Sequence, residues 1–498
     1  MNEPPIVIIG AGIAGLCTAL AAAPRKVLVL SRGSAGNDGA TPLAQGGIAA
    51  ALGADDSPAQ HAHDTVIAGA GCNDLEAVAV LTTQAAEAIV WLQQQGVAFD
   101  RDGDQLSLHL EGGHSHARIA HAGGDRSGQR IAHALAAAVA KHAAHVTLQS
   151  GCDVDALLLR EGRVVGVRTR DHNGQSQQIM AAAVVLATGG IGALFACTSN
   201  PPSANGAGLA LGLRAGAAGR DLEFIQFHPT ALAPNDGALP AQLPLISEAI
   251  RGAGARLCDG DGRALMAAID VRGDLAPRDI VARRVWQARH AGASTWLDAR
   301  SIGERWPERF PTVFAACQAQ AIDPRREPIP VLPAAHFHMG GLATDLLGRT
   351  RVPGLFAVGE VACNGVHGSN RLASNSLLEG VVFGRRLGAW LADDIATPAA
   401  TGALQTLALG PPLDVANWQR LRQLLWQHLG PVRSASGLDT ALATITNNPS
   451  LAASWPGELA RALLNAARQR AYSIGAHYRS DDALGTHSPK VRCCSPSG

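Results

Sequence analysis

The sequence has no excess of charge of either sign, because its 41 lysines and arginines are matched by 41 aspartates and glutamates. A global basic field for nucleic acid or for an anionic membrane surface is therefore not expected, and any anion site must be local. The nine cysteines include no Cys-x-x-Cys pair, which argues against a zinc ribbon or a cysteine-ligated iron–sulfur cluster. Histidines cluster at His61/His63 and His114/His116 without a carboxylate triad or a repeated ligand spacing, so we expect no metal site.

Signals for export or for membrane insertion are also missing. The apolar run near the N-terminus follows no basic region and ends at Gly10, which is too early for a signal peptide with a cleavage site. The longest apolar stretches are rich in alanine and are interrupted by Gly, Arg or His, so no membrane span is expected. Together with cysteines that follow no spacing pattern, these features predict a cytoplasmic protein.

A glycine-rich turn near the N-terminus is the first informative motif. Residues 6–9 form a continuous apolar strand, an Ala/Leu-rich helix follows the turn, and residues 26–30 predict a second strand. In the G-x-G-x-x-G turn, Gly10 reverses the chain, Gly12 lets the backbone reach a pyrophosphate, and Gly15 lets the helix pack on the strand. This strand–turn–helix context predicts a dinucleotide site.

The acid that a NAD site places on the ribose is missing, since the second strand ends in Ser31-Arg32. Four later segments favour FAD instead. They are glycine-rich loops at 44–48 and 187–190, a strand–Gly–acid segment at 350–360 that resembles the ribityl-binding segment of FAD proteins, and the start of a helix at 374–380. The amides at such a helix start can face the electron-rich edge of an isoalloxazine.

The order of apolar patterns predicts an α/β fold with a discontinuous, Rossmann-like FAD-binding domain. Residues 1–221 and 338–404 are assigned to this domain, residues 222–337 to an inserted α+β capping domain, residues 405–480 to a C-terminal helical bundle, and residues 481–498 to a disordered tail. Within the first domain, helices are expected over 76–95 and 128–143, and further strands at 164–167, 183–187 and 354–358. An inserted cap of this kind encloses a substrate between two bodies.

Four further motifs carry a specific resemblance. They are L-A-Q-G-G-I-A-A at 43–50, E-G-G-H-S-H at 111–116, I-Q-F-H-P-T at 225–230 and L-A-P-R-D at 275–279. Together with the nucleotide motifs, and in this order, they resemble the succinate dehydrogenase/fumarate reductase flavoprotein superfamily over nearly the whole chain. Within that superfamily they look like the L-aspartate oxidase family.

This resemblance implies a set of FAD contacts in the glycine-rich loops and at helix starts. The set is Gly10, Ala11, Gly12, Ile13, Ala14, Gly15, Arg32, Ala40, Thr41, Ala44, Gln45, Gly46, Gly47, Thr188, Gly189, Gly190, Ala207, Glu360, Ser376 and Leu377. In the membrane-complex members a histidine before the A-Q-G-G loop carries the flavin covalently. The matching position here is Ala40, so FAD should be bound non-covalently. Ala207 replaces the acid of a family G-D-G stretch, which removes one polar group near the flavin.

A dicarboxylate substrate needs at least two cationic or multi-donor ligands, because burying unpaired carboxylates is costly. The substrate residues that the resemblance implies are Arg278, Gln226, His228, His336, Arg371, Ser247 and Glu111. Arg278 matches the proton-transfer arginine of the superfamily, and Glu111 matches the acid that orients a substrate amino group. Ser247 stands where the family usually has threonine. Each residue alone has an ordinary structural explanation, so the prediction depends on their joint match.

The implied reaction is the FAD-dependent oxidation of L-aspartate to iminoaspartate, the first step of de novo NAD biosynthesis. Reduced flavin would be reoxidised by O2, giving H2O2, or by fumarate, giving succinate. Quinolinate synthase, the next enzyme of the pathway, is a candidate for transient contact. Because a guanidinium is hard to deprotonate, it stays open whether Arg278 acts as a base or only binds and polarises L-aspartate.

Two alternatives remain open at this point. A soluble fumarate reductase or succinate dehydrogenase flavoprotein predicts covalent FAD or an iron–sulfur partner, and a neutral residue in place of Glu111. A flavin protein that modifies RNA predicts a basic face, which the balanced charge does not supply. The physiological electron acceptor and the oligomeric state do not follow from the sequence.

Overall fold

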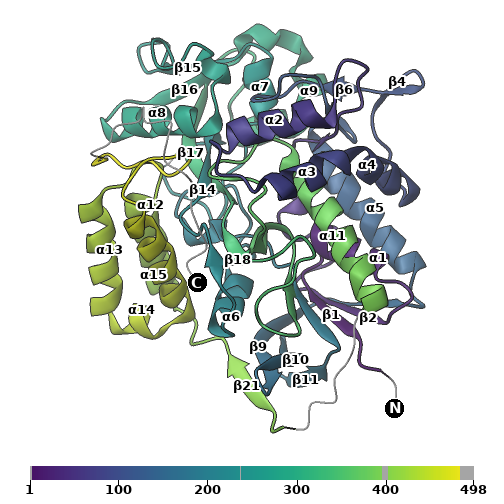
Figure 1. Ribbon diagram of the computed structural model, residues 1–498. Helices are drawn as coiled ribbons and strands as arrows, with labels where there is room; N and C mark the ends of the chain where they lie inside the picture. The colour runs from purple at the N-terminus through teal and green to yellow at the C-terminus, as the bar shows by residue number, and fades with distance from the viewer. Residues whose placement is uncertain (1–2, 236, 395–401, 483–498) are drawn as a thin grey trace.

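The computed structural model describes residues 3–235, 237–394 and 402–482. A five-stranded parallel sheet in the order β19-β12-β1-β2-β8 lies in the lower half of Figure 1. Its strands are β1 (Ile6–Ile9), β2 (Val27–Leu30), β8 (Val146–Gln149), β12 (Ala183–Leu186) and β19 (Leu355–Ala357). Every residue of β1 and β12 is buried, as expected of apolar strands inside a parallel sheet. The four strands of this sheet that were predicted from apolar runs are confirmed to within one residue at each end.

Helices α1 (Ile13–Ala21) and α11 (Asn375–Asp394) pack closely against each other. Glycines recur every fourth residue along α11, at Gly380, Gly384 and Gly388, and so share one face of the helix. A Cβ at Gly384 would lie 2.8 Å from the carbonyl oxygen of Ala14, and one at Gly388 would lie 2.4 Å from that of Thr18. This spacing of glycines therefore permits the close approach of the two helices.

Two more helices follow the predicted pattern with one change. The helix expected over 128–143 is α5 (Ser127–Lys141), whereas the one expected over 76–95 divides at Gln84 into α3 (Leu75–Thr83) and α4 (Ala85–Gln94). Among the described residues, no single helix is long and apolar enough to cross a membrane, although α3 and α4, bent by 44°, pass that test as a pair.

A second, antiparallel sheet packs beside the first in the order β11-β10-β9-β21. Its strands are β9 (Cys152–Arg160), β10 (Arg163–Asp171), β11 (Ser176–Met180) and β21 (Gln405–Ala408). The strand expected at 164–167 is part of β10. Residues 405–408 were expected to begin the helical bundle, but they pair with β9 as an edge strand, so the C-terminal helices begin only at Val415.

The inserted segment forms a four-stranded antiparallel sheet, in the order β14-β17-β16-β15, with helices around it at the top of Figure 1. These elements are β14 (Ile225–Leu232), β15 (Arg256–Asp259), β16 (Thr295–Asp298), β17 (Ile329–His338), α7 (Glu248–Gly252), α8 (Arg278–His290), α9 (Trp306–Arg309) and α10 (Pro311–Ala319). All eight residues of β14 are buried, and β17 pairs with it along its length. This sheet brings both strands that carry predicted substrate residues into contact.

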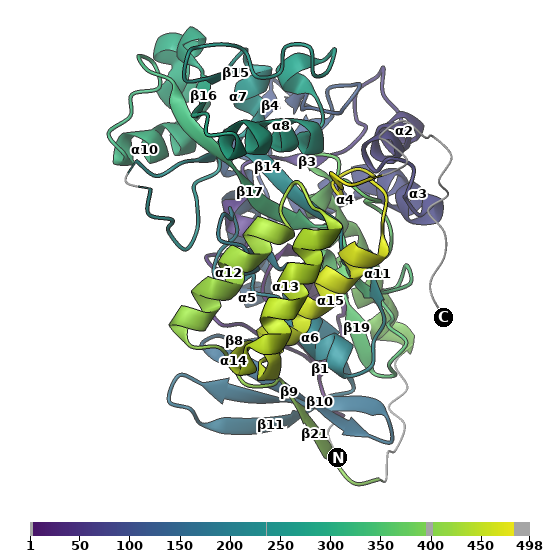
Figure 2. The ribbon, with the colours of Figure 1, turned by 90° about the vertical axis from the view of Figure 1, so that its left-hand side faces the viewer.

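The C-terminal helices lie side by side in Figure 2. They are α12 (Val415–His428), α13 (Ala435–Asn447), α14 (Pro449–Ala453) and α15 (Trp455–Gln469). Their leucines join the buried apolar cluster that also contains β12 and α6 (Ala207–Arg214). Of the tail predicted to be disordered, residues 483–498 lie outside the described residues. The fold is α/β, with a parallel sheet and a helical C-terminal region.

One further α-helix and several strands of two or three residues lie between these elements. They are α2 (Pro58–Ala68) and the small strands β3 (Ile48–Ala49), β4 (Arg101–Asp102), β5 (Gln105–Leu106), β6 (Leu108–His109), β7 (Ile119–Ala120), β13 (Gly219–Arg220), β18 (Gly341–Ala343) and β20 (Ala362–Cys363).

Candidate functional site

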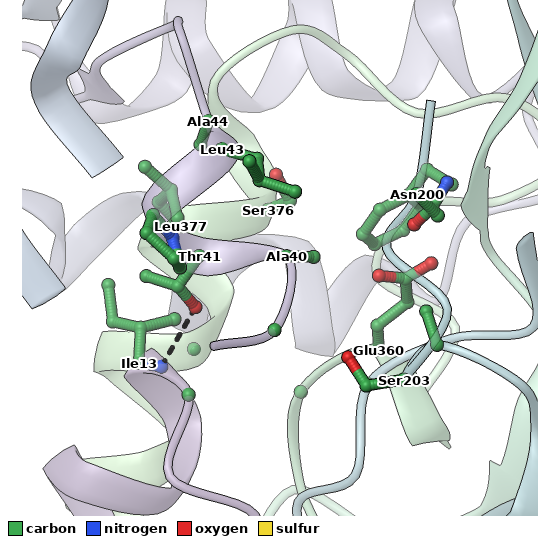
Figure 3. Close-up of a pocket in the computed structure, with 18 of the residues that line it drawn as sticks. Ile13, Ala40, Thr41, Leu43, Ala44, Asn200, Ser203, Glu360, Ser376 and Leu377 are labelled. Atoms are coloured by element: carbon green, nitrogen blue, oxygen red, sulfur yellow. Dashed lines mark hydrogen bonds between the residues drawn. The ribbon is translucent and has the colours of Figure 1, made fainter. Parts of the chain in front are cut away.

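A cavity of about 580 Å³ lies at the carboxyl ends of the parallel strands, between the starts of α1 and α11 and the inserted sheet. This is the place where open α/β sheets bind their ligands. Figure 3 shows two of its walls, one with Ala40, Thr41 and Leu377, the other with Ser203 and Glu360.

The cavity brings together almost all of the predicted site residues. Those that line it are Gly10, Ala11, Gly12, Ile13, Ala14, Arg32, Ala40, Thr41, Ala44, Gln45, Gly46, Gly47, Thr188, Gly189, Ala207, Glu360, Ser376, Leu377, Glu111, His228, Ser247, Arg278, His336 and Arg371. Three predicted residues, Gly15, Gly190 and Gln226, lie behind the wall instead.

The turn after β1 fits a pyrophosphate. Gly10 has a φ of 113°, and a Cβ there would lie 2.2 Å from the carbonyl oxygen of Ala187, so the turn requires glycine. Gly15 lets helix α1 pack closely on the turn, because a Cβ added at this position would lie 2.1 Å from the carbonyl oxygen of Gly10. Helix α1 begins with no side-chain cap and no acid in its first turn, and the Ile13 amide donates to Thr41 Oγ1 at 3.1 Å (Figure 3). The positive end of the helix is thus available to an anion.

Asp38, an acid in the loop that follows β2, lines the cavity although it was not among the predicted residues. Arg32, at the end of β2, forms an ion pair with Asp153. Asp38 lines the cavity from the following loop, and its Oδ1 accepts from the Gly39 amide at 2.7 Å and lies 3.4 Å from Ser203 Oγ. The acid of a NAD site is expected at the end of the second strand, where this chain has Arg32. The remaining sequence signal for Asp38 was the N-D-G turn at 37–39 in the loop after that strand.

Unpaired polar atoms show that the cavity is built for a polar ligand. Thr188 Oγ1, Gln45 Oε1, His228 Nε2 and Arg371 Nε are buried in its wall and have no hydrogen-bond partner within the described part of the chain. Buried polar groups in proteins almost always have a hydrogen-bond partner, so a bound ligand is the expected partner of these four atoms. The first two belong to the loops predicted to hold FAD, and the residues present therefore fit that cofactor.

Glu360 and Ala40 complete the cofactor side. Burial raises the pKa of Glu360 to about 7, and its Oε1 accepts from the His338 amide at 2.9 Å. Gly190 leaves room for this side chain, since a Cβ there would lie 2.1 Å from the same oxygen. The amide of Ala207 is held by Asn205 Oδ1 at 3.1 Å. Ala40 carries only a methyl group, which cannot form a covalent link to a flavin.

Two arginines face the cavity from opposite elements and share one acceptor. Arg278 begins α8, Arg371 follows β20, and the Nη1 of the first and the Nη2 of the second each donate to Gln226 Oε1 at 3.2 Å. The amide nitrogen of Gln226 donates to Asn370 Oδ1 and to the Arg371 carbonyl oxygen, both at 2.8 Å. Gln226 is fully buried, so the structure places it as the group that orients both guanidiniums.

Two neutral histidines lie beside the arginines. The rings of His228 and His336 are 5.2 Å apart in a T-shaped arrangement. Burial, and then the positive charge of Arg278, lower the pKa of His228 well below its ordinary value, and the pKa of His336 is lowered in the same direction by burial and by His228. His336 Nδ1 bonds to Ser199 Oγ at 3.0 Å. Across the described ranges, no group of three or more His, Cys, Asp and Glu side chains is arranged to hold a metal ion.

Glu248 is a site residue that the sequence analysis did not identify. Ser247 caps α7 by accepting from the Ala249 amide at 3.3 Å, which places Glu248 in the cavity wall. Its Oε2 accepts from Arg278 Nε at 2.7 Å, and its Oε1 lies 3.4 Å from Arg251 Nη2. Burial alone would raise the pKa of Glu248, but the two arginines outweigh it and lower that pKa to about 2. Glu248 is therefore a carboxylate under all ordinary conditions.

Glu111 enters the cavity from the other side. It is 8% exposed, its Oε2 accepts from Ser374 Oγ at 2.7 Å, and its Oε1 lies 3.6 Å from His121 Nε2. None of the arginines of the site bonds to it in the described ranges, in contrast to Glu248. Beside the two cations that suit carboxylates, the substrate side of the site thus holds Glu111, an acid that can take a cationic ligand.

Comparisons with known proteins agree with this chemistry. The FAD binding domain family matches residues 5–377. The chain is 45% identical over 488 residues to the L-aspartate oxidase of Caulobacter vibrioides, which covers 95% of this chain and 93% of that relative. It is 42% identical over 522 residues to the L-aspartate oxidase of Streptomyces coelicolor, with 96% and 88% covered.

Solved structures give the same fold. A quinol–fumarate reductase with menaquinol molecules is 28% identical, with a TM-score of 0.86 and coverage of 97% of this chain and 93% of that one. Mycobacterium smegmatis Sdh1 in complex with UQ1 is 30% identical, with a TM-score of 0.83 and coverage of 97% and 89%.

Proposed function

Because the chain belongs to the L-aspartate oxidase family, we propose that its cavity holds FAD beside L-aspartate and oxidises the amino acid to iminoaspartate, the first step of de novo NAD biosynthesis. The observation that carries this proposal is the meeting of Arg278, Arg371 and Glu111 in one cavity. When bound, FAD supplies the redox chemistry by accepting a hydride equivalent from the substrate Cα and passing the electrons to O2, giving H2O2, or to fumarate, giving succinate.

The two arginines bind the two carboxylates of the substrate. Because Gln226 takes one N–H from each, both guanidinium planes are fixed while Arg371 Nε stays free within the described chain. His228 Nε2 is also buried and without a partner within the described chain. In the neutral tautomer whose Nδ1 accepts from the Thr230 amide, at 3.3 Å, Nε2 can donate to a carboxylate oxygen. Fixed donors hold the substrate in one orientation, and hydride transfer tolerates little misplacement.

Glu111 binds the amino group. In the part of the chain that the structure describes, no arginine bonds to its carboxylate, so a substrate ammonium or amine is a partner that would complete it. Fumarate and succinate carry no such group. Glu111 therefore distinguishes L-aspartate from an unsubstituted dicarboxylate.

Arg278 binds and polarises a carboxylate during L-aspartate oxidation. The ion pair with Glu248 stabilises its positive charge, which disfavours a role as a base. When fumarate is the acceptor, Arg278 is the cation placed to donate a proton, and its bond to Glu248 keeps the guanidinium oriented toward the cavity.

The Glu111→Gln variant tests this assignment. The amide keeps the shape of the side chain and removes its charge. The kcat/KM for L-aspartate should therefore fall about 10- to 100-fold, as expected from about 1.5–3 kcal/mol for a hydrogen bond to a charged group. Reoxidation of the reduced enzyme by fumarate serves as the internal control and should change little. Equal losses with both substrates would remove the amino-group role and leave Glu111 as a structural carboxylate.

Three further assignments are part of the proposal. The FAD-binding domain comprises residues 1–221 and 338–404, the cap residues 222–337, and the C-terminal helical domain residues 405–480, of which 405–408 pair with β9 before the helices begin. The protein acts in the cytoplasm. Iminoaspartate passes to quinolinate synthase through a transient contact. With the three-carbon co-substrate of that enzyme supplied, the contact would be detected as a rise in quinolinate yield when the two purified enzymes are mixed rather than separated by a membrane.

A further inference from the structure

Ser374 combines a strained backbone with a buried side chain at the edge of the cavity. Its φ is 61°, in the left-handed region that L residues adopt at a cost, and it is 6% exposed. The surrounding chain enforces this conformation. The Ser374 carbonyl oxygen accepts from the Ala49 amide at 3.2 Å, and the side chain of the next residue, Asn375, bonds to His61 Nε2 at 2.8 Å.

The backbone alone does not explain the serine. Glycine would adopt the same φ without strain, so the side chain must contribute something that offsets its cost. Its hydroxyl donates to Glu111 Oε2 at 2.7 Å. A hydrogen bond to an ionised group is stronger than one between neutral groups, and here both partners are buried.

The neighbours of this pair leave the other side of Glu111 open. Its Oε1 faces His121 Nε2 at 3.6 Å, which is longer than a hydrogen bond. Gly46 lies next to both side chains, and a Cβ there would come within 3.1 Å of Ser374 Oγ and 3.5 Å of Glu111 Oε1. Both Gly46 and Ser374 line the cavity, so the carboxylate is fixed at one oxygen and accessible near the other.

We infer that Ser374 is a positioning residue that gives the site its preference for an amino acid over an unsubstituted dicarboxylate. Its hydroxyl fixes Glu111 in the rotamer that presents a carboxylate oxygen to the substrate amine. A fixed side chain loses less rotational freedom when the ligand binds. This inference rests on the proposed amino-group role of Glu111. Substrates without an amino group do not use Glu111 and are therefore insensitive to Ser374.

Ser374→Gly is the sharpest test, because it removes the hydroxyl and relieves the strain together. In anaerobic stopped-flow measurements, the rate constant of flavin reduction divided by the Kd of L-aspartate should fall about tenfold. This is the effect expected for the loss of a hydrogen bond to a charged group. Reoxidation by fumarate and FAD content should be unchanged. The melting temperature should change little, because the relief of backbone strain at this φ offsets the lost hydrogen bond. A lower melting temperature with parallel losses for both substrates would assign Ser374 a purely structural role.

Two controls separate the backbone from the hydroxyl. Ser374→Ala keeps the strain and removes the hydroxyl, so it should show the same selective loss for L-aspartate. Ala321→Gly relieves a left-handed residue of similar φ, 59°, in the turn after α10, where it is exposed and does not line the cavity. It should leave both half-reactions unchanged. Full activity of Ser374→Ala toward L-aspartate would overturn the inference.

A double-mutant cycle separates this inference from the proposed function. If Ser374 acts through Glu111, Ser374→Gly should have no further effect on L-aspartate reduction in the Glu111→Gln background. If Glu111→Gln alone fails to discriminate between L-aspartate and fumarate, the proposed function fails. If Glu111→Gln discriminates but Ser374→Gly does not, only the role of Ser374 fails.

Discussion

Replacing Glu248 by glutamine should destabilise the protein and impair both half-reactions. Glu248 is 6% exposed and lies between Arg278 and Arg251, which lower its pKa from 4.5 to about 2. A difference of that size corresponds to about 3 kcal/mol of native-state stability, at about 1.4 kcal/mol for each pKa unit. The amide retains an acceptor for Arg278 but leaves two buried cations without their shared anion, a change that typically costs about 3–5 kcal/mol. Arg278 also loses its fixed orientation, so reduction by L-aspartate and reoxidation by fumarate should both slow.

Urea unfolding followed by tryptophan fluorescence measures the effect. A folded-state pKa below the unfolded one means that the contribution of Glu248 is fully present above about pH 4.5 and is lost as the pH falls toward 2. The stability difference between wild type and Glu248→Gln should therefore shrink with decreasing pH in this window. Glu458→Gln is the matched control, because Glu458 forms an ion pair with Arg214 while 47% exposed, and it should cost less than about 1 kcal/mol. A loss at pH 7 no larger than that of the control would show that Glu248 is not the shared anion of Arg278 and Arg251.

Two further predictions concern the cofactor. Gly12→Val should abolish FAD binding while far-ultraviolet circular dichroism stays close to wild type, because a Cβ at Gly12 meets only Thr41 Oγ1, at 3.3 Å, and the added side chain would otherwise occupy the phosphate position. Full FAD content in this variant would show that the pyrophosphate binds elsewhere. Acid precipitation of the wild-type protein should release FAD into the supernatant, because Ala40 offers no atom for a covalent link, and flavin retained in the pellet would contradict this.

The parts of the fold that follow from local rules could be predicted from the sequence. The apolar run Ile6–Ile9 predicts a buried parallel strand, and the turn at Gly10 predicts that this strand is followed by a helix whose N-terminus can bind an anion. The L-aspartate oxidase family could also be recognised from the sequence, because its motifs are specific in order and spacing.

The parts that depend on tertiary pairing could not be predicted. Residues 405–408 form a strand only because β9 offers a free edge, and nothing in their own sequence reveals that partner. Glu248 begins a short helix in S-E-A-I-R, a pattern that usually marks a solvated helix start, and its burial depends on the separate start of α8 at Arg278. The contacts of Gln226 also depend on tertiary pairing. The resemblance placed this residue among the substrate ligands, and the structure shows its amide bonded to Arg278, Arg371 and Asn370, which come from distant parts of the chain.

Anaerobic reduction of the bound flavin shows whether the cavity oxidises an amino dicarboxylate, as proposed. The purified protein is mixed without oxygen with L-aspartate or with succinate, and the visible absorbance of FAD is followed. We expect rapid bleaching by L-aspartate and none by succinate on the same time scale, because succinate has no amino group to pair with Glu111. Bleaching by succinate with no response to L-aspartate would instead assign the protein to the dicarboxylate dehydrogenases.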